Sequence, residues 1–252
     1  MENMNIGLIG LGHMGAAFWK RFHEAQSQGL LKDWQLKAGT RENNTDVAAW
    51  ADLLVATVKP GQIEEMLGQI RGQVRRGTGL LSFAGAVPVQ FLEKHFDGAV
   101  GRGMADLGFE QAIRYGGDER MKYLLDALSI DDCLETQDEI DVDRHTTLVA
   151  CNPGISAWQF LHNAVAAREW LASHNDFTHE VLGVHKTAME RLQARVLEEG
   201  DLDAKIKAVA TPGGVTESMV KALEAAHGRV DCRELYGVGM GRIQEVGARF
   251  LL

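Results

Sequence analysis

A glycine-rich turn near the start of the chain constrains the fold most strongly. The apolar stretch from Asn5 to Ile9 predicts a short strand, and a helical apolar pattern begins at Met14. Between them stands Gly10-Leu11-Gly12-His13-Met14-Gly15, the GxGxxG pattern of a dinucleotide-binding turn. In such turns the glycines allow a tight turn, the approach of a pyrophosphate and close helix–strand packing. This order predicts a Rossmann-type sheet with a dinucleotide site; a glycine turn without a ligand is the alternative.

The end of the second predicted strand indicates which dinucleotide is bound. Trp34 to Gly39 reads as that strand, and Thr40-Arg41 follows it, where an NAD site usually has an acid. A guanidinium suits a 2′-phosphate, so we expect NADP(H), with NAD(H) less favoured. A solvent-exposed arginine is the alternative, and the neighbouring Glu42 weakens the indication.

Further alternation of strands and helices extends this α/β domain. The nearly continuous apolar run from Ala51 to Val58 predicts a buried parallel strand, and it leads into Lys59-Pro60. The pattern then predicts helix 63–74, strand 79–83, helix 91–96 and strand 99–104. Residues 131–143 are rich in acids, which favours a solvated strand edge and linker over a metal site. We therefore expect a doubly wound dinucleotide-binding domain over residues 1–143.

Residues 144–252 predict an all-helical second domain. One long, buried helix is indicated by the apolar residues Trp158, Leu161, Val165 and Leu171. A second helix is indicated by Val181, Val184, Ala188, Leu192 and Val196.

The stretch from Ala208 to Leu223 contains a bare glycine turn that leads into a helix. Pro212 lacks an N–H, and Gly213 and Gly214 can take positive φ. Thr216 is a candidate helix cap, and Gly228 a candidate stop. We expect free N–H groups from Gly213 to Thr216, which suit a carboxylate or phosphate. A tight interhelical turn without a ligand is the alternative.

The segment Thr211-Pro212-Gly213-Gly214-Val215-Thr216 resembles the signature of the pyrroline-5-carboxylate reductases. The resemblance implies a helical domain that forms a homodimer or higher oligomer and binds a small imine or amino-acid substrate. It implies that the substrate's carboxylate and ring nitrogen are bound by Thr211, Gly213, Gly214, Val215 and Thr216. It also implies that Thr216 and Glu199 serve catalysis.

The resemblance extends to the cofactor side of the chain. Thr57-Val58-Lys59-Pro60 matches a strand end that lies beside the cofactor in the family, and Asn44 takes the place of a cofactor-binding asparagine. Phe83-Ala84-Gly85 corresponds to a small-residue turn that lies against the nicotinamide. The implied activity is NADPH-dependent reduction of a cyclic imine carboxylate, 1-pyrroline-5-carboxylate to L-proline.

Three departures from the family pattern keep other functions open. Only Glu42 and Asn43 separate Arg41 from Asn44, so the Rossmann half is shortened. The loop from Ala105 to Gly108 and the stretch from Pro153 to Ser156 also differ, and Asp106 is a candidate for selecting a substrate with an extra amine. A related imine reductase with another substrate and a non-catalytic NADP-binding regulatory protein are therefore alternatives. A β-hydroxyacid dehydrogenase is disfavoured, because no lysine accompanies Trp158.

Composition excludes several partners. The 252 residues carry a net charge of −9, which argues against nucleic acid and anionic membranes. No apolar run reaches membrane-spanning length, and no signal peptide is expected. Cys133, Cys151 and Cys232 lack metal or redox spacing, so we expect reduced thiols, no metal and a cytoplasmic location.

Overall fold

The computed structural model describes residues 3–131, 133–198 and 201–251, and the chain divides into two compact units. The first unit comprises Met1–Val142 together with Gly247–Leu252, and the second comprises Asp143–Val246. The C-terminal segment therefore belongs to the first unit, whereas the sequence suggested the second. Its Phe250 ring packs against Phe91 at a centroid distance of 4.9 Å, which buries an aromatic contact in the first unit.

The first unit is built on a seven-stranded sheet in the order β2-β1-β3-β4-β5-β6-β7. All neighbouring strands are parallel except β5 and β6, which are antiparallel. The strands are β1 (Met4–Ile9), β2 (Trp34–Gly39), β3 (Leu53–Ala56), β4 (Gly79–Ser82), β5 (Val100–Ala105), β6 (Ala112–Gly116) and β7 (Leu134–Thr136). This is the predicted Rossmann-type α/β sheet.

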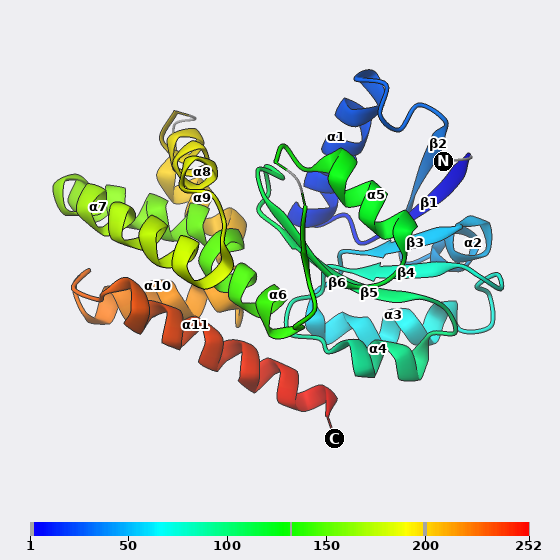
Figure 1. The fold of residues 1–252 in the computed structure, drawn as a ribbon. Helices are drawn as coiled ribbons and strands as arrows, with labels where there is room; N and C mark the ends of the chain where they lie inside the picture. Colours follow the sequence, from blue (N-terminus) through cyan, green and yellow to red (C-terminus); the bar gives the residue numbers. More distant parts are fainter. Residues whose placement is uncertain (1–2, 132, 199–200, 252) are drawn as a thin grey trace. The chain divides into compact units, whose positions relative to one another are not determined.

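Helices cover both faces of this sheet (Figure 1). An apolar layer joins the strands to α1 (His13–Ser27) and α5 (Glu119–Leu128). A second apolar layer joins the opposite face to α2 (Asn44–Trp50), α3 (Ile63–Ile70) and α4 (Val89–His95). Because β3 and β4 are buried on both faces, their sequences are continuously apolar rather than alternating.

Two predicted elements of the first unit are shorter in the structure. The strand expected to Val58 ends at Ala56, because Thr57 turns to hydrogen-bond the β1 end. The helix expected to reach residue 74 ends at Ile70, and Gly72 has a positive φ of 76°.

The acid-rich segment 131–143 forms the edge strand β7 and the start of α6 (Ile140–His145). Its carboxylates are not simply solvated. Glu139 accepts a hydrogen bond from buried Arg102 of β5 at 2.8 Å, and Glu135 accepts one from buried Arg114 of β6 at 2.6 Å. These acids therefore compensate guanidinium groups inside the sheet, which would be costly to leave unpaired.

The second unit is helical, as predicted. Its elements are the end of α6, a π-helical stretch η2 (Thr146–Ala150), α7 (Asn152–Leu182), α8 (Lys186–Glu198), α9 (Leu202–Val209), α10 (Val215–Ala225) and most of α11 (Cys232–Gly247). A short 3₁₀ turn, η3 (Ala248–Phe250), follows in the first unit. Within the described residues, no helix has the combined length and apolarity needed to cross a membrane.

The helices predicted for the second unit from the sequence agree only in part with the structure. The helix predicted from Val181 onward is interrupted at Gly183, whose φ of 68° ends α7, and α8 begins after it. Leu161, expected in the core, is 44% exposed. The side chains of Val165 and Val196 lie outside the described part of the structure.

The chain reverses direction within α7 (Figure 1). Asn152 Nδ2 lies 3.5 Å from His174 Nδ1, although the two residues are 22 positions apart. A straight helix would separate them by about 33 Å. The two ends of α7 are therefore packed side by side, with polar side chains between them.

Two histidines of this unit are fully buried. His145 has no hydrogen-bond partner for either ring nitrogen within the described residues, and burial lowers its pKa to about 3. Burial also lowers the pKa of His174 to about 4, although Asn152 and Thr178 lie beside its ring. Both imidazoles are thus neutral in the folded protein at neutral pH.

We predict acid-sensitive stability from these histidines. Below the ordinary histidine pKa of 6.5 the unfolded chain binds protons that the folded chain excludes, so the free energy of unfolding falls as pH falls. The expected slope is about 1.4 kcal/mol per pH unit for each histidine, down to the folded pKa. Urea unfolding between pH 7 and pH 5 measures it, and His145→Phe should reduce the slope. An unchanged slope in this variant would contradict the assignment.

Candidate active site

The glycine turn after β1 is held by contacts that leave little room for side chains. Gly10 has a φ of 104°, in the left-handed region that favours glycine. The Thr57 hydroxyl, from the end of β3, donates to the Gly10 carbonyl. A Cβ at Gly15 would collide with that same carbonyl oxygen. Thr57 and Gly15 therefore fix the conformation of the turn.

The second glycine of the motif faces open space. A Cβ built on Gly12 would meet no atom within 4 Å. Gly12 is the N-cap residue of α1, where no side chain caps the helix and no acid stands in the first turn. The first amides of α1, including those of His13 and Met14, are therefore available to a phosphate at the positive end of the helix.

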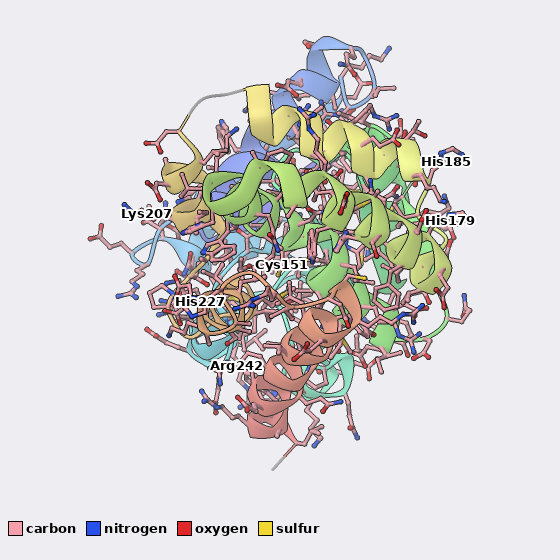
Figure 2. All side chains as sticks on the ribbon, turned by 90° about the vertical axis from the view of Figure 1, so that its left-hand side faces the viewer. Cys151, His179, His185, Lys207, His227 and Arg242 are labelled. Atoms are coloured by element: carbon pink, nitrogen blue, oxygen red, sulfur yellow. The ribbon has the colours of Figure 1, made fainter. Side chains whose placement is uncertain are left out.

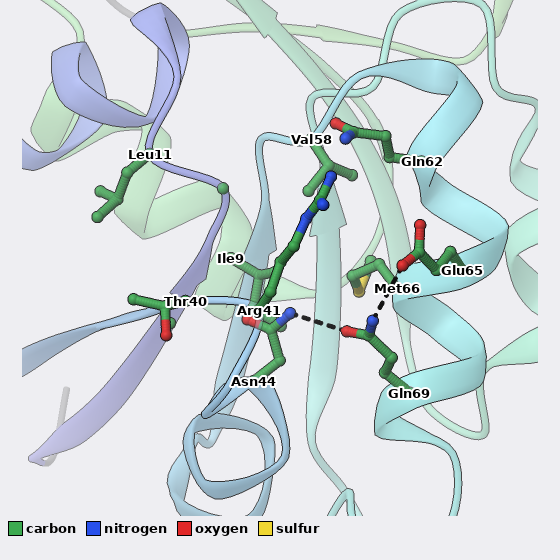
Figure 3. Close-up of a pocket in the computed structure, with 12 residues that line it drawn as sticks. Ile9, Leu11, Thr40, Arg41, Asn44, Val58, Gln62, Glu65, Met66 and Gln69 are labelled. Atoms are coloured by element: carbon green, nitrogen blue, oxygen red, sulfur yellow. Dashed lines mark hydrogen bonds between the residues drawn. The ribbon is translucent and has the colours of Figure 1, made fainter.

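A cavity of about 360 Å³ lies beside this turn (Figure 3). It brings together six of the predicted cofactor residues, namely Gly10, Leu11, Thr40, Arg41, Asn44 and Val58. Sequence reasoning missed the opposite wall, which consists of Gln62, Glu65, Met66 and Gln69 at the start of and along α3. The spacing of Gln62, Glu65 and Gln69 places them on one helical face. These three polar residues follow soon after the end of β3, so the sequence could have indicated that they face the cofactor site.

The cavity has the chemistry of a nucleoside site. Asn44 is 7% exposed, and its Oδ1 is buried and accepts no hydrogen bond within the described residues. Buried acceptors are normally paired, so a donor from a ligand would complete this site. A ribose hydroxyl is such a donor, and the Arg41 guanidinium in the same cavity suits a phosphate. The residues present therefore fit a dinucleotide.

The cofactor residues predicted after β3 and β4, apart from Val58, do not line this cavity. Lys59 and Pro60 lead into the 3₁₀ turn η1 (Pro60–Gln62). After β4, Phe83 and Ala84 are buried, whereas a Cβ at Gly85 would meet only Met104 at 3.8 Å. Backbone space is therefore open at Gly85.

The loop after β5 differs from our expectation. Asp106 is fully buried, and its carboxylate accepts hydrogen bonds from the amides of Gly108 at 2.6 Å and Gln111 at 3.1 Å. The prediction that Asp106 selects a substrate amine is therefore wrong, because this carboxylate stabilises its own loop.

In the second unit, the Pro-Gly-Gly loop forms the entry to α10. Gly214 is the N-cap residue, so the expectation that Thr216 caps the helix is wrong, and Thr216 lies in its first turn. A Cβ at Gly214 would stand 2.6 Å from Thr211 Oγ1 and 2.9 Å from the Thr211 carbonyl oxygen. The helix ends at Ala225, where the Gly228 amide donates back to the Leu223 carbonyl at 2.8 Å.

Two loop amides that we expected to be free are already bonded. Gly213 N–H donates to Glu217 Oε2 at 2.8 Å, and Gly214 N–H donates to the Thr211 carbonyl at 2.8 Å. The Gly213 hydrogen bond, followed by Lys221, lowers the pKa of Glu217. At the next peptide, the guanidinium of Arg242 in α11 (labelled in Figure 2) donates to the Gly213 carbonyl at 2.7 and 3.0 Å. The loop thus binds a carboxylate, and this carboxylate is the side chain of Glu217.

Thr216 is the buried polar group of this loop. It is 5% exposed and hydrogen-bonds the thiol of Cys151, which precedes α7. Burial raises the pKa of Cys151 to about 11, although the Thr216 hydrogen bond acts in the opposite direction. Neither Cys151 nor Arg242 was identified from the sequence as part of this loop. Glu199, the second predicted catalytic residue, lies outside the described residues.

No metal centre accompanies these groups. Within the described ranges, no three histidine, cysteine or acidic side chains converge in a metal-binding arrangement.

The glycine turn predicts two contrasting variants. Gly15→Ala should lower the free energy of unfolding by about 3 kcal/mol, because its Cβ meets a fixed backbone carbonyl. Gly12→Ala should fold like the wild type but bind NADPH more weakly, because its Cβ enters the open space beside α1. Urea unfolding and fluorescence titration with NADPH measure the two effects. A wild-type unfolding midpoint for Gly15→Ala, or wild-type NADPH affinity for Gly12→Ala, would contradict these roles.

Comparisons with known proteins give a sequence relative and several structural neighbours. No family model matches the chain. A pyrroline-5-carboxylate reductase of Methanosarcina acetivorans is 29% identical over 107 residues, which cover 37% of this chain and 40% of the relative. The aligned segment thus spans well under half of that curated relative.

Solved structures agree in fold over a longer range. A pyrroline carboxylate reductase of Plasmodium falciparum with NADP bound gives a TM-score of 0.59 at 18% identity, covering 98% of this chain and 99% of that one. A pyrroline-5-carboxylate reductase of Coxiella burnetii gives 0.56 at 17% identity, covering 96% and 98%. The predicted resemblance is thereby confirmed: the chain is similar to pyrroline-5-carboxylate reductases, in sequence over the aligned segment and in fold over nearly its full length.

Proposed function

We propose that the chain is an NADPH-dependent oxidoreductase that reduces a cyclic imine carboxylate, 1-pyrroline-5-carboxylate, to L-proline. The observation that carries the proposal is the Gly213 amide, which binds a carboxylate at 2.8 Å. The Pro-Gly-Gly loop thus has the chemistry that a carboxylate substrate requires. The dinucleotide cavity of the first unit and the relationship in sequence and fold support the same activity.

The residues of this chain have binding and orienting roles in the reaction. A nicotinamide dinucleotide would be held by the cavity lined by Thr40, Arg41 and Asn44, and it would supply the hydride for the imine carbon. An iminium carbon is already electrophilic, so the protein need only align it and exclude water. In our proposal Thr216 orients the nitrogen, Gly213 and Gly214 bind the carboxylate through their amides, and Glu199 assists Thr216.

Substrate binding requires Glu217 to leave the Gly213 amide, and the Gly214 amide to release the Thr211 carbonyl. Lys221 Nζ already lies 3.2 Å from Glu217 Oε2, so the displaced carboxylate retains a cationic partner. Thr211 and Val215 complete the loop around the substrate. Because a hydroxyl can donate one hydrogen bond and accept others, Thr216 can contact the substrate while bonded to Cys151.

Preference for NADPH over NADH is part of the proposal and rests on Arg41. Arg41→Ala should weaken NADPH binding by about 1.5–3 kcal/mol, the range for a hydrogen bond to a charged group, and change NADH binding far less. Fluorescence titration gives both dissociation constants. Arg71→Ala is the matched control, because Arg71 is exposed beyond α3 and does not line the cavity. Equal wild-type affinities for NADPH and NADH would refute the preference.

Substitutions at the substrate loop should reduce activity in two different ways. Gly214→Val should nearly abolish turnover while NADPH binding is retained, because its side chain collides with Thr211. Thr216→Val should lower kcat/KM by about 1–3 kcal/mol, the cost of an unpaired buried polar group, and Glu199→Gln should affect the same step. Steady-state kinetics with 1-pyrroline-5-carboxylate measures both, and thermal unfolding controls for stability. Wild-type turnover in Gly214→Val would mean that the loop is only a structural turn.

A non-catalytic NADP-binding regulatory protein is the second candidate. The observation that favours it is the same Glu217 contact, because a loop occupied by its own carboxylate admits a substrate less readily. NADPH oxidation with a panel of cyclic imines separates the two functions. A homodimer or higher oligomer is also proposed, on the resemblance, and a cytoplasmic location, on the spacing of the three cysteines.

A further inference from the structure

We propose that Glu65 is a positioning residue of the dinucleotide site. Acting through Gln69, it fixes the Asn44 amide so that the Asn44 oxygen is the acceptor offered to a cofactor hydroxyl. This inference rests on the proposed dinucleotide function and adds two residues of α3 to it.

The three side chains form a continuous hydrogen-bonded chain along the cavity wall (Figure 3). Asn44 Nδ2 donates to Gln69 Oε1 at 3.1 Å, and Gln69 Nε2 donates to Glu65 Oε1 at 3.3 Å. Asn44 begins α2, whereas Glu65 and Gln69 lie one turn apart on α3. The chain therefore connects two helices that the shortened segment after β2 brings to the same cavity.

The direction of this chain is set by its carboxylate end. An amide can present either its oxygen or its nitrogen to a neighbour, so two linked amides alone have no preferred direction. A carboxylate only accepts, so Gln69 must turn its nitrogen toward Glu65 and its oxygen toward Asn44. Asn44 must then use its nitrogen on Gln69, which leaves its oxygen for another donor.

The side-chain oxygen of Asn44 receives no hydrogen bond from the described residues. This atom is buried and has no partner among the described residues. It lies against the end of β2, where a Cβ at Gly39 would stand 2.6 Å away. Without Glu65, the amides could reverse so that Gln69 donates to this oxygen. After this reversal the buried Asn44 oxygen would accept from Gln69. The Asn44 nitrogen, which is a donor, would then be offered to the cofactor instead of the oxygen.

Glu65→Gln tests the mechanism, because the new amide can donate as well as accept. The reversed chain then becomes accessible, and the fraction of protein that offers the Asn44 oxygen falls. We expect NADPH to bind on the order of tenfold more weakly, the scale of one lost hydrogen bond. Removing a negative charge should by itself strengthen binding of an anionic dinucleotide, so weaker binding opposes the simple charge effect.

Glu64→Gln is the matched control. Glu64 is the neighbouring acid on α3, is exposed and does not line the cavity. The same chemical change there should leave NADPH affinity unchanged or slightly stronger. Circular dichroism and thermal unfolding of each variant show whether the fold is retained.

A swapped double variant restores the direction of the chain. In Glu65→Gln/Gln69→Glu, the carboxylate at position 69 accepts from both neighbours, so Asn44 must again use its nitrogen there. Net charge equals that of the wild type, and NADPH affinity should return to within about twofold of it. Loss of a merely structural contact would not be restored in this way.

The outcomes distinguish this inference from the proposed function. Absence of any NADPH or NADH binding by the wild type would overturn the dinucleotide function, and the inference with it. Binding by the wild type, with Glu65→Gln equal to Glu64→Gln, would overturn the inference alone. It would also be overturned if Glu65→Gln weakened binding and the swapped variant did not recover it.

Discussion

The first unit depends on the close approach of α1 to the ends of β1 and β3. The Gly10 carbonyl is the meeting point, since Thr57 donates to it and Gly15 packs so closely that a Cβ would collide with it. As a result of this packing, the start of α1, which no side chain caps, faces open space beside Gly12. This backbone geometry suits a phosphate, and no cationic side chain is needed for it.

Polar groups in both units serve mainly to orient other polar groups. Thr57 fixes a turn, Arg242 fixes the Gly213 peptide, and Asp106 fixes its own loop. Each is buried or bonded where the sequence suggested contact with a ligand or gave no indication of a role. Because a buried polar group is costly unless paired, these orienting contacts also hold the loops in single conformations.

The shortened segment after β2 changes how a nucleoside could be held. Only Glu42 and Asn43 separate Arg41 from Asn44. Here α2 begins soon after Arg41, and α3 supplies the facing polar wall through Gln62, Glu65 and Gln69. The polar groups that line the cavity consequently include three side-chain amides, one carboxylate and the Arg41 guanidinium.

The sequence by itself determined the Rossmann-type sheet, the helical second unit and six of the twelve residues that line the cavity beside the glycine turn. It could do so because glycine spacing, continuous apolar strands and helical periodicity are local properties of the chain. Only the structure showed that the Gly213 amide donates to Glu217 and that the Gly213 carbonyl accepts from Arg242. It also decided the reversal of α7, the burial of Asp106 and the meeting of Asn44 with Gln69. The contacts of Arg242 with Gly213, Asn152 with His174 and Asn44 with Gln69 join residues 29, 22 and 25 positions apart, so no local pattern specifies them.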